Sequence, residues 1–323
     1  MNQTSSALQR RRLLLSLAAA PALAPFAPAA ARPASTTETS MFDIHYRTRQ
    51  IGPVEVFYRE AGAADAPVIL LLHGFPTSSH MFRDLIPLLA DRYRVIAPDL
   101  PGFGLTRAPG RESFDYSFDN LAKVIGQFTD AMGLGRYALY VFDYGAPTGL
   151  RLAMARPERV SAIISQNGNA YLEGLSTEWD AWQAYWREPT EDNRARCRAA
   201  LTDEFIRSQY EQGAPAGRVA PDGYTLDQFF MHRAAAADIQ LDLILSYRTN
   251  VALYPAFQGY FRQHQPPLLA VWGKNDPYFL PAGAEAFRRD LPKAEVHLLD
   301  TGHFALETHH REIAGIIRRF LPA

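Results

Sequence analysis

The sequence predicts an α/β protein that is built on a mostly parallel sheet with helices on both faces and an inserted helical cap. Short apolar runs typical of buried strands alternate with segments of helical spacing between residues 54 and 169. Residues 171–257 interrupt this alternation, because they contain no strand of the same kind and are rich in helical, aromatic and charged residues. The alternation then resumes at Pro267.

Composition limits the classes of function. The chain has 323 residues, of which 47% are hydrophobic and 21% charged, which is typical of a globular protein with a large core. Its 33 basic and 34 acidic residues give a net charge of -1, so we expect no binding of nucleic acid. Cys197 is the only cysteine, which excludes an intramolecular disulfide and a cysteine-based metal site. The sequence contains no phosphate-binding loop, and we expect neither a cofactor nor a metal.

The N-terminal residues resemble an export signal. Arg10, Arg11 and Arg12 precede an apolar run at 13–23, and Ala-x-Ala cleavage sites follow. The run is too short to span a bilayer, so we expect no stable membrane insertion. Residues 1–31 therefore predict export to the periplasm by a twin-arginine-like route. The alternative is an uncleaved extension or a true start at Met41, with a cytoplasmic protein.

In the first half of the core, apolar spacing predicts each element in turn. Phe118, Leu121, Ile125, Phe128 and Met132 have helical spacing, and the helix ends before a glycine. In order, we expect an antiparallel edge strand at 54–59, a buried strand at 68–72, an amphipathic helix around 81–89, a strand at 93–97 and the helix at 118–132.

The second half of the core repeats the same units around the cap. We expect strands at 138–142, 160–165, 267–273 and 295–299, helices at 149–155 and 284–290, and a last helix that carries Ile313, Ile316, Ile317 and Phe320 on one face. The predicted domains are a core of residues 42–169 and 258–323 and a cap of residues 170–257.

Asp143 follows a strand directly and precedes a sharp turn into a helix. Such a strand-turn-helix is a nucleophile elbow, in which Gly145 is small enough for helix and strand to approach closely. A carboxylate is ionised near neutrality and can displace a leaving group from a saturated carbon to give an alkyl ester. The alternative is that Asp143 only caps the following helix.

Two further polar residues follow strands at the same edge of the sheet. Asp276 follows the strand at 267–273 and His303 follows the last strand, and ligands collect at this edge of a parallel sheet. We expect His303 to activate water against the ester and Asp276 to hold the imidazole in one tautomer. Asp99 and Asp300 are rival acids; Asp99 lies in a Pro-Gly turn, and Asp300 is only three residues from His303.

Backbone N–H groups are expected to form an oxyanion hole. In this arrangement the donors are the residue after the nucleophile, Tyr144, and a residue after an earlier strand, Phe75. Pro76 has no N–H, but it comes after the required donor. We interpret His73 as a structural turn residue rather than a second base.

These motifs resemble the epoxide hydrolase and haloalkane dehalogenase branch of the α/β-hydrolases, and the resemblance covers nearly everything after Met41. It is carried by His73-Gly74-Phe75-Pro76, Asp99-x-Pro101-Gly102-Phe103-Gly104, Asp143-Tyr144-Gly145, Asp276 and Gly302-His303-Phe304. The resemblance implies the α/β-hydrolase fold and a two-step reaction through an alkyl-Asp ester, without a cofactor, on a small neutral apolar substrate and water.

The leaving group depends on what stabilises it. An epoxide opens to an alkoxide that needs a proton donor, and Leu245-Ser-Tyr247-Arg248-Thr-Asn250 looks like the cap segment that supplies a tyrosine acid in epoxide hydrolases. The position of the family's other cap tyrosine holds Trp182, with Tyr185 one helical turn later. Trp182 and Tyr185 are therefore expected in the substrate pocket. The alternative for both is an apolar helix face that packs on the core.

A halide needs N–H donors, which haloalkane dehalogenases supply from a Trp beside the nucleophile and a second Trp or Asn. Here these positions hold Tyr144 and Phe75, although Trp182 could bind halide. Epoxide hydrolysis is therefore our first prediction, and haloalkane dehalogenation is the alternative. The turn after Asp143 lacks the arginine of fluoroacetate-type dehalogenases, so a haloacid is disfavoured. A non-catalytic binding protein is the alternative of another class, and the Asp-His-Asp set argues against it.

Overall fold

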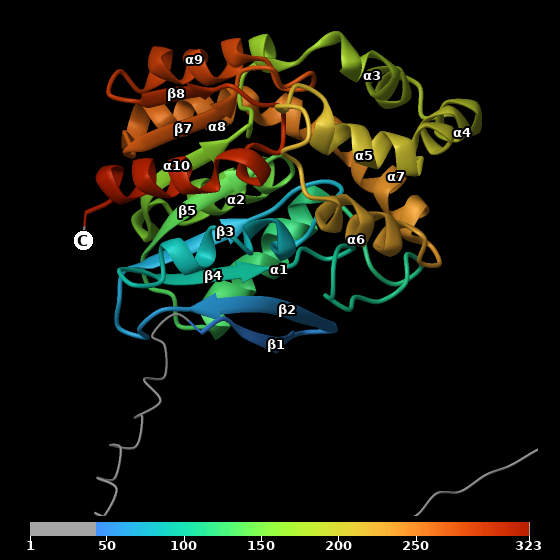
Figure 1. Ribbon diagram of the computed structural model, residues 1–323. Coiled ribbons are helices and arrows are strands. Elements are labelled where there is room, and N and C mark those ends of the chain that lie inside the picture. The colour runs from blue at the N-terminus through green and yellow to red at the C-terminus, as the bar shows by residue number, and fades with distance from the viewer. Residues whose placement is uncertain (1–42, 323) are drawn as a thin grey trace, which may run out of the picture. The chain divides into compact units, whose positions relative to one another are not determined.

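The computed structural model describes residues 43–322. Within these residues the chain forms one eight-stranded sheet with the order β1-β2-β4-β3-β5-β6-β7-β8 (Figure 1). The pairs β1–β2 and β2–β4 are antiparallel and all other neighbouring pairs are parallel. The strands are β1 (His45–Ile51), β2 (Val54–Ala61), β3 (Val68–Leu72), β4 (Arg94–Pro98), β5 (Tyr137–Phe142), β6 (Val160–Gln166), β7 (Leu268–Gly273) and β8 (Glu295–Leu299).

Helices cover both faces of this sheet, which explains why its central strands are continuous apolar runs. On one face lie α1 (Phe118–Ala131), α2 (Gly145–Ala155), α8 (Arg248–His264) and α9 (Pro281–Asp290). On the other face lie α10 (Ala305–Phe320) and the 3-10 turns η1 (Ser79–Phe82) and η2 (Ile86–Leu88). The predicted α/β fold class, a mostly parallel sheet between two helical layers, is confirmed.

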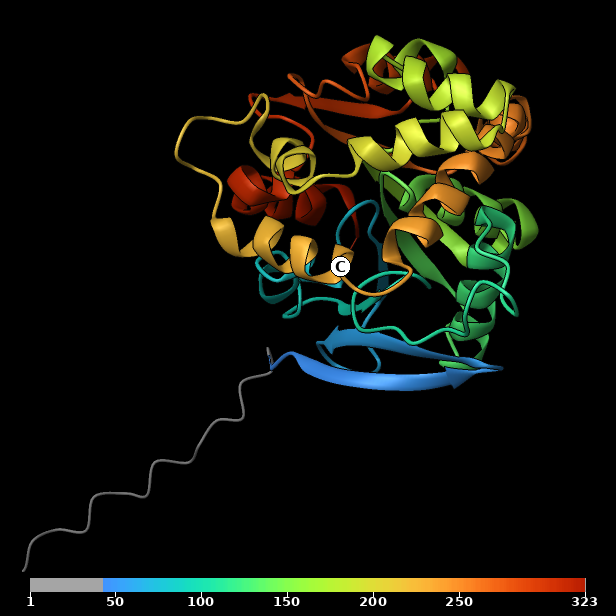
Figure 2. The same cartoon turned by 90° about the vertical axis from the view of Figure 1, so that its right-hand side faces the viewer.

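A helical insertion stands between β6 and β7, at the carboxyl ends of the strands (Figure 2). We call it the cap insertion. It consists of α3 (Asp180–Arg187), α4 (Glu191–Ala200), α5 (Asp203–Glu211), α6 (Pro221–Met231) and α7 (Ala236–Ser246). The predicted boundary at residue 257 lies inside α8, a continuous helix that packs on α2 and α9. The division of the chain into core and cap domains otherwise stays a prediction.

Two of the predicted elements differ in the structure. The strand at 54–59 is not the edge, because β1 pairs outside it; every residue of β1 except Ile51 is exposed, so no apolar pattern marks this strand. The expected helix around 81–89 is instead two 3-10 turns. Pro87 lacks the N–H that an α-helix needs there. Met81 and Phe82 are still buried, as an amphipathic segment requires.

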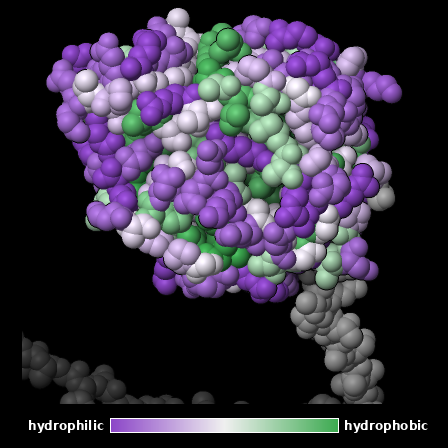
Figure 3. All heavy atoms as spheres, turned by 180° about the vertical axis from the view of Figure 1, so that it is seen from behind, coloured by the Kyte–Doolittle hydropathy of each residue, from purple (hydrophilic) through white to green (hydrophobic). Residues whose placement is uncertain are grey.

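The face of the molecule opposite to the view of Figure 1 is largely polar. Figure 3 shows one face, on which hydrophilic residues predominate and hydrophobic ones form smaller groups between them. Within residues 43–322, no helix has the length and apolar character needed to cross a membrane. The predicted export signal at 1–31 and the alternative start at Met41 lie outside the described residues.

Candidate active site

Asp143 occupies a tight turn between β5 and α2. Its backbone φ is +47°, in the left-handed region that residues other than glycine rarely adopt. The turn is held on both sides, because β5 pairs with β3 and β6. Only glycine fits at Gly145, where a Cβ would lie 2.2 Å from the Leu72 carbonyl oxygen. This close approach of α2 to β3 fixes the Asp143 side chain at the carboxyl ends of the strands.

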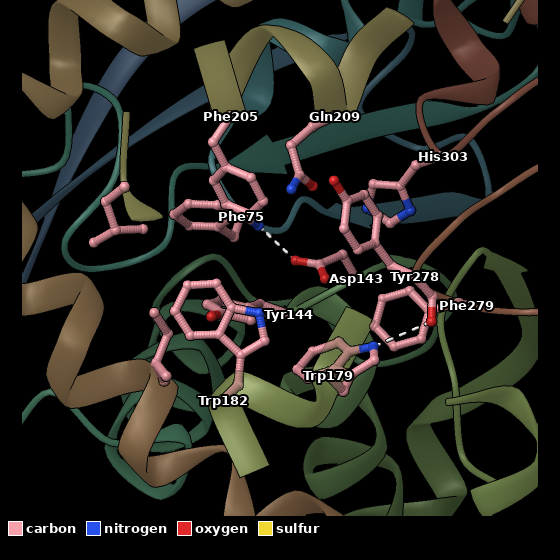
Figure 4. A pocket seen from close by; sticks show the side chains of 12 residues that line it. Phe75, Asp143, Tyr144, Trp179, Trp182, Phe205, Gln209, Tyr278, Phe279 and His303 are labelled. Atoms are coloured by element: carbon pink, nitrogen blue, oxygen red, sulfur yellow. Dashed lines mark hydrogen bonds between the residues drawn. The ribbon is translucent and has the colours of Figure 1, made fainter. Parts of the chain in front are cut away.

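One oxygen of the Asp143 carboxylate lies among backbone N–H groups. The Phe75 N–H donates to Oδ1 at 2.6 Å, and the Tyr144 N–H also hydrogen bonds to the carboxylate. Gly74 permits this arrangement, since a Cβ there would lie 2.2 Å from Oδ1. The structure thus places both predicted oxyanion-hole donors beside Asp143, and Oδ2 is the oxygen to which Phe75 does not donate (Figure 4).

His303 and Asp276 form a buried pair. The distance from His303 Nδ1 to Asp276 Oδ2 is 2.7 Å. The Asp276 carboxylate also accepts a hydrogen bond from Asn167 Nδ2 and one from the Tyr278 N–H, both at 2.7 Å. Because ionised Asp276 can only accept, Nδ1 of the imidazole carries the proton and Nε2 is the acceptor. Such an imidazole can take a proton from water.

The rival acids do not contact His303. Asp99 accepts hydrogen bonds from the backbone N–H groups of Ser79 and Leu105, and so supports a turn. Asp300 pairs at the surface with Lys274. His73 Nε2 accepts from the Leu100 N–H, which agrees with a structural role in its turn.

Burial and neighbouring charges shift both titratable groups of the site. Burial raises the pKa of the Asp143 carboxyl to about 6, although His303 and the two backbone donors lower it. Burial lowers the pKa of His303, but the carboxylates of Asp276 and Asp143 outweigh this effect, so its pKa lies above the ordinary value. Each group therefore favours the ionised form of the other.

A small cavity in front of Asp143 is walled mainly by aromatic rings (Figure 4). Its volume of about 40 Å³ is room for roughly three water molecules. Its lining residues come from the core loops, the segment before α3, the turn between α4 and α5, and helices α3, α5 and α7: Phe75, Asp143, Tyr144, Trp179, Trp182, Leu201, Phe205, Gln209, Ile244, Tyr278, Phe279 and His303. A compact neutral substrate fits such walls better than a charged one.

The structure brings one of the three predicted cap residues into this cavity. Trp182 lines it. Tyr185 does not, since its hydroxyl accepts a hydrogen bond from Arg194 at 3.0 Å inside the cap insertion. Tyr247 does not either: its ring lies 4.6 Å from that of Trp179, between centroids, and its hydroxyl hydrogen bonds to Tyr254. Tyr247 therefore packs behind the lining residues Tyr144 and Trp179, and its assignment as the acid stays a prediction.

Several residues of the site had not been predicted from the sequence. Asn167 holds Asp276, and the polar turn that follows β6 could have indicated it. Tyr278 and Gln209 supply polar groups to the cavity. Tyr278 lies two residues after Asp276, whereas nothing in the sequence of α5 distinguishes Gln209. Within residues 43–322, no cluster of three or more His, Cys, Asp or Glu side chains could hold a metal ion.

Comparison with known proteins places the chain in a family. Residues 67–310 match the family model described as the alpha/beta hydrolase fold. An uncharacterised hydrolase of Saccharomyces cerevisiae is 48% identical over 266 residues, which cover 81% of this chain and 91% of that protein. Haloalkane dehalogenase 2 of Mycobacterium tuberculosis is 45% identical over 267 residues, which cover 79% of this chain and 88% of that protein.

Solved structures show the same fold. Haloalkane dehalogenase DbeA from Bradyrhizobium elkani aligns with a TM-score of 0.69 at 24% identity, over 86% of this chain and 99% of that chain. The epoxide hydrolase CorEH aligns with a TM-score of 0.71 at 17% identity, over 86% of this chain and 98% of that chain. These relatives are hydrolases, so the alternative of a non-catalytic binding protein gains no support from them. The chain is therefore a hydrolase of the α/β-hydrolase superfamily, in its haloalkane dehalogenase and epoxide hydrolase-like branch.

Proposed function

We propose that the protein is a cofactor-independent epoxide hydrolase that works through a covalent alkyl ester at Asp143. The observation that carries this proposal is the Asp143 carboxylate, whose Oδ1 is bound by the Phe75 N–H in a cavity shared with His303. A carboxylate oriented by one oxygen can attack a saturated carbon with the other. His303, supported by Asp276, is then the base for the second step.

The proposed reaction has two steps. In the first, Oδ2 of Asp143 bonds to a ring carbon, and the electron pair of the breaking C–O bond goes to the epoxide oxygen, which takes up a proton. In the second, Nε2 of His303 removes a proton from water, and the hydroxide attacks the ester carbonyl carbon. The Phe75 and Tyr144 N–H groups stabilise the oxyanion at Oδ1. The ester C–O bond then breaks, and the diol leaves with the proton from His303.

The donors in the cavity favour an epoxide over a halide. The Phe75 N–H is bound to the carboxylate, and the Trp179 indole N–H donates to the Tyr278 carbonyl oxygen at 3.1 Å. Of the two tryptophans that line the cavity, Trp179 and Trp182, only Trp182 has an indole N–H that could donate to a halide. Tyrosine hydroxyls, in contrast, can protonate an alkoxide, and Tyr144 and Tyr278 both line the cavity.

Haloalkane dehalogenation is the second candidate function. It is favoured by the 45% identity to haloalkane dehalogenase 2 and by Trp182, whose indole N–H makes no hydrogen bond within the described residues. The two functions share Asp143, His303 and Asp276. They differ in the mass that remains on Asp143 after the first step, because an opened epoxide keeps its oxygen and a haloalkane loses its halogen.

This difference is the basis of the test. We expect the His303→Gln variant, when exposed to a panel of small epoxides, to gain the mass of one whole epoxide by intact-protein mass spectrometry. The Asp143→Asn, His303→Gln double variant should gain nothing, because the amide is not a nucleophile. A gain of only the alkyl group from a parallel panel of haloalkanes, with none from epoxides, would replace the proposal by dehalogenation. No adduct from either panel would contradict both.

A further inference from the structure

The departing epoxide oxygen needs a proton donor, and a donor in the wall of the cavity can reach it directly. Tyr185 and Tyr247 do not line the cavity. In a displacement the leaving oxygen departs on the side opposite the attacking one, so its donor must stand across the cavity from Asp143. Figure 4 shows the Gln209 carboxamide and the Tyr278 hydroxyl next to each other at the wall of the cavity.

Gln209 is a buried polar side chain that is aimed into the cavity. Only 5% of the residue is exposed, and it reaches the cavity from α5, one helical turn after Phe205. Figure 4 shows its carboxamide beside the hydroxyl of Tyr278. A buried carboxamide usually has a hydrogen-bond partner, and the Tyr278 hydroxyl is the polar group of the cavity that lies beside it.

The Tyr278 ring is held in place by its own backbone. Its N–H donates to Asp276 Oδ1, so one carboxylate orients both His303 and Tyr278. The Tyr278 carbonyl oxygen accepts from the indole of Trp179 and from the Ser176 N–H. The ring lies against His303, with 5.6 Å between centroids. The hydroxyl is therefore fixed relative to the base of the second step.

We propose that Tyr278 is the acid that protonates the departing epoxide oxygen, and that Gln209 is the positioning residue that holds its hydroxyl. This assignment rests on the proposed epoxide hydrolase function. As the ring C–O bond breaks, the hydroxyl proton of Tyr278 goes to the oxygen and a phenolate remains. When the ester is cleaved, Asp143 is released as a carboxylic acid; its proton returns to the phenolate through water, and the cycle closes.

The ionisation of Tyr278 suits this role. Burial raises the pKa of its hydroxyl to about 12, although the neighbouring polar side chains of Ser208 and Gln209 lower it. The hydroxyl is therefore protonated at neutral pH and is still a stronger acid than the alcohol that it creates. Loss of the Gln209 carboxamide would make it a weaker donor.

The test measures the rate of adduct formation in the His303→Gln background with 1,2-epoxybutane, by time-resolved intact-protein mass spectrometry. We expect Tyr278→Phe to slow alkylation about 100-fold, the scale of general acid catalysis, and Gln209→Leu to slow it about tenfold. Tyr260→Phe removes the hydroxyl of another buried tyrosine, which packs on Phe261 and His264, and should react at the rate of the parent.

A second readout separates acid catalysis from a structural effect. The loss in Tyr278→Phe and Gln209→Leu should shrink with 3,3,3-trifluoro-1,2-epoxypropane, because its opened alkoxide is less basic and needs the proton less. An equal loss with both epoxides would contradict the inference, as would alkylation of Tyr278→Phe at the rate of the parent. Slowing in Tyr247→Phe but not in Tyr278→Phe would give the role to Tyr247. If the parent forms no epoxide adduct at all, the proposed function itself fails.

Discussion

Asp143 combines a left-handed backbone with a carboxylate removed from water. Burial makes the carboxylate harder to ionise, and the backbone donors and His303 partly restore the charge. A weakly solvated carboxylate is a better nucleophile than a hydrated one, because it has less water to lose. The same balance makes the first step of the proposed reaction sensitive to pH near neutrality.

We expect the rate of Asp143 alkylation to fall as the pH drops through about 6, because the protonated carboxyl is not a nucleophile. In His303→Gln the fall should begin at higher pH, since the charge that lowers the pKa of Asp143 has been removed. The measurement is the pH profile of adduct formation in the two proteins before the steady state. A rate that does not change through pH 6 in the wild-type protein would contradict the assignment.

A buried polar contact joins helices α5 and α6 of the cap insertion, and an aromatic contact joins α5 to the His303 loop. The Asp227 side chain on α6 is inaccessible to solvent and accepts a hydrogen bond from the Tyr210 hydroxyl on α5. The Tyr210 ring stacks on Phe304, the neighbour of His303, with 3.7 Å between centroids. Among the described residues, Asp227 Oδ1 has no hydrogen-bond partner. Burial raises the pKa of this carboxyl to about 8.

This contact should make stability depend on pH. In the unfolded chain Asp227 ionises near its ordinary pKa of about 4. Between that value and about 8 the folded state therefore binds more protons than the unfolded state. The stability that the protonated Asp227 carboxyl contributes is therefore lost as the pH rises through this window. The free energy of unfolding falls by at most about 1.4 kcal/mol per pH unit.

We expect Asp227→Asn to remove this loss, so that the variant gains stability relative to wild type between about pH 5 and pH 8. The measurement is urea unfolding of both proteins at these two values. Asp192→Asn is the control, because this side chain is 85% exposed, and its profile should follow that of wild type. A wild-type protein that is no less stable at the higher pH would contradict a buried neutral carboxyl at residue 227.

At the scale of the whole molecule, the site draws on distant parts of the sequence. The loop after β3, the elbow after β5, the turn after β7 and the loop after β8 meet because the carboxyl ends of parallel strands share one edge. The cap insertion adds Trp182 and Gln209 above them. Core and cap must therefore fold together for the cavity to form.

We also propose that residues 1–31 export the folded protein. The basis is the sequence Arg10-Arg11-Arg12 before an apolar run. We expect the full chain, expressed in a Gram-negative bacterium, to appear in the periplasmic fraction. An Arg11→Lys, Arg12→Lys variant, and a chain that starts at Met41, should remain in the cytoplasm. Equal distribution of all three proteins would contradict an export signal.

The core was predictable from sequence because its signals are local. The β3 boundaries match the predicted ones, since an apolar run bounded by turn residues marks a buried strand, and those of the edge strand β8 match as well. The positions of Asp143, Asp276 and His303 follow from the rule that ligands gather at strand ends. Edge position was not predictable, because it depends on which strand pairs outside β2, and β1 has no apolar pattern.

The cap insertion was decided by tertiary structure. Its aromatic residues have the same helical spacing whether they face the cavity or pack inside the cap, so sequence alone could not separate Trp182 from Tyr185 and Tyr247. The placement of Gln209 depends on how α5 crosses the core, which no local pattern records. The sequence by itself thus determined the fold class and the position of the elbow, through periodicity and turn chemistry. Tertiary packing decided which polar groups face the substrate, because side-chain direction depends on the partner that each helix meets.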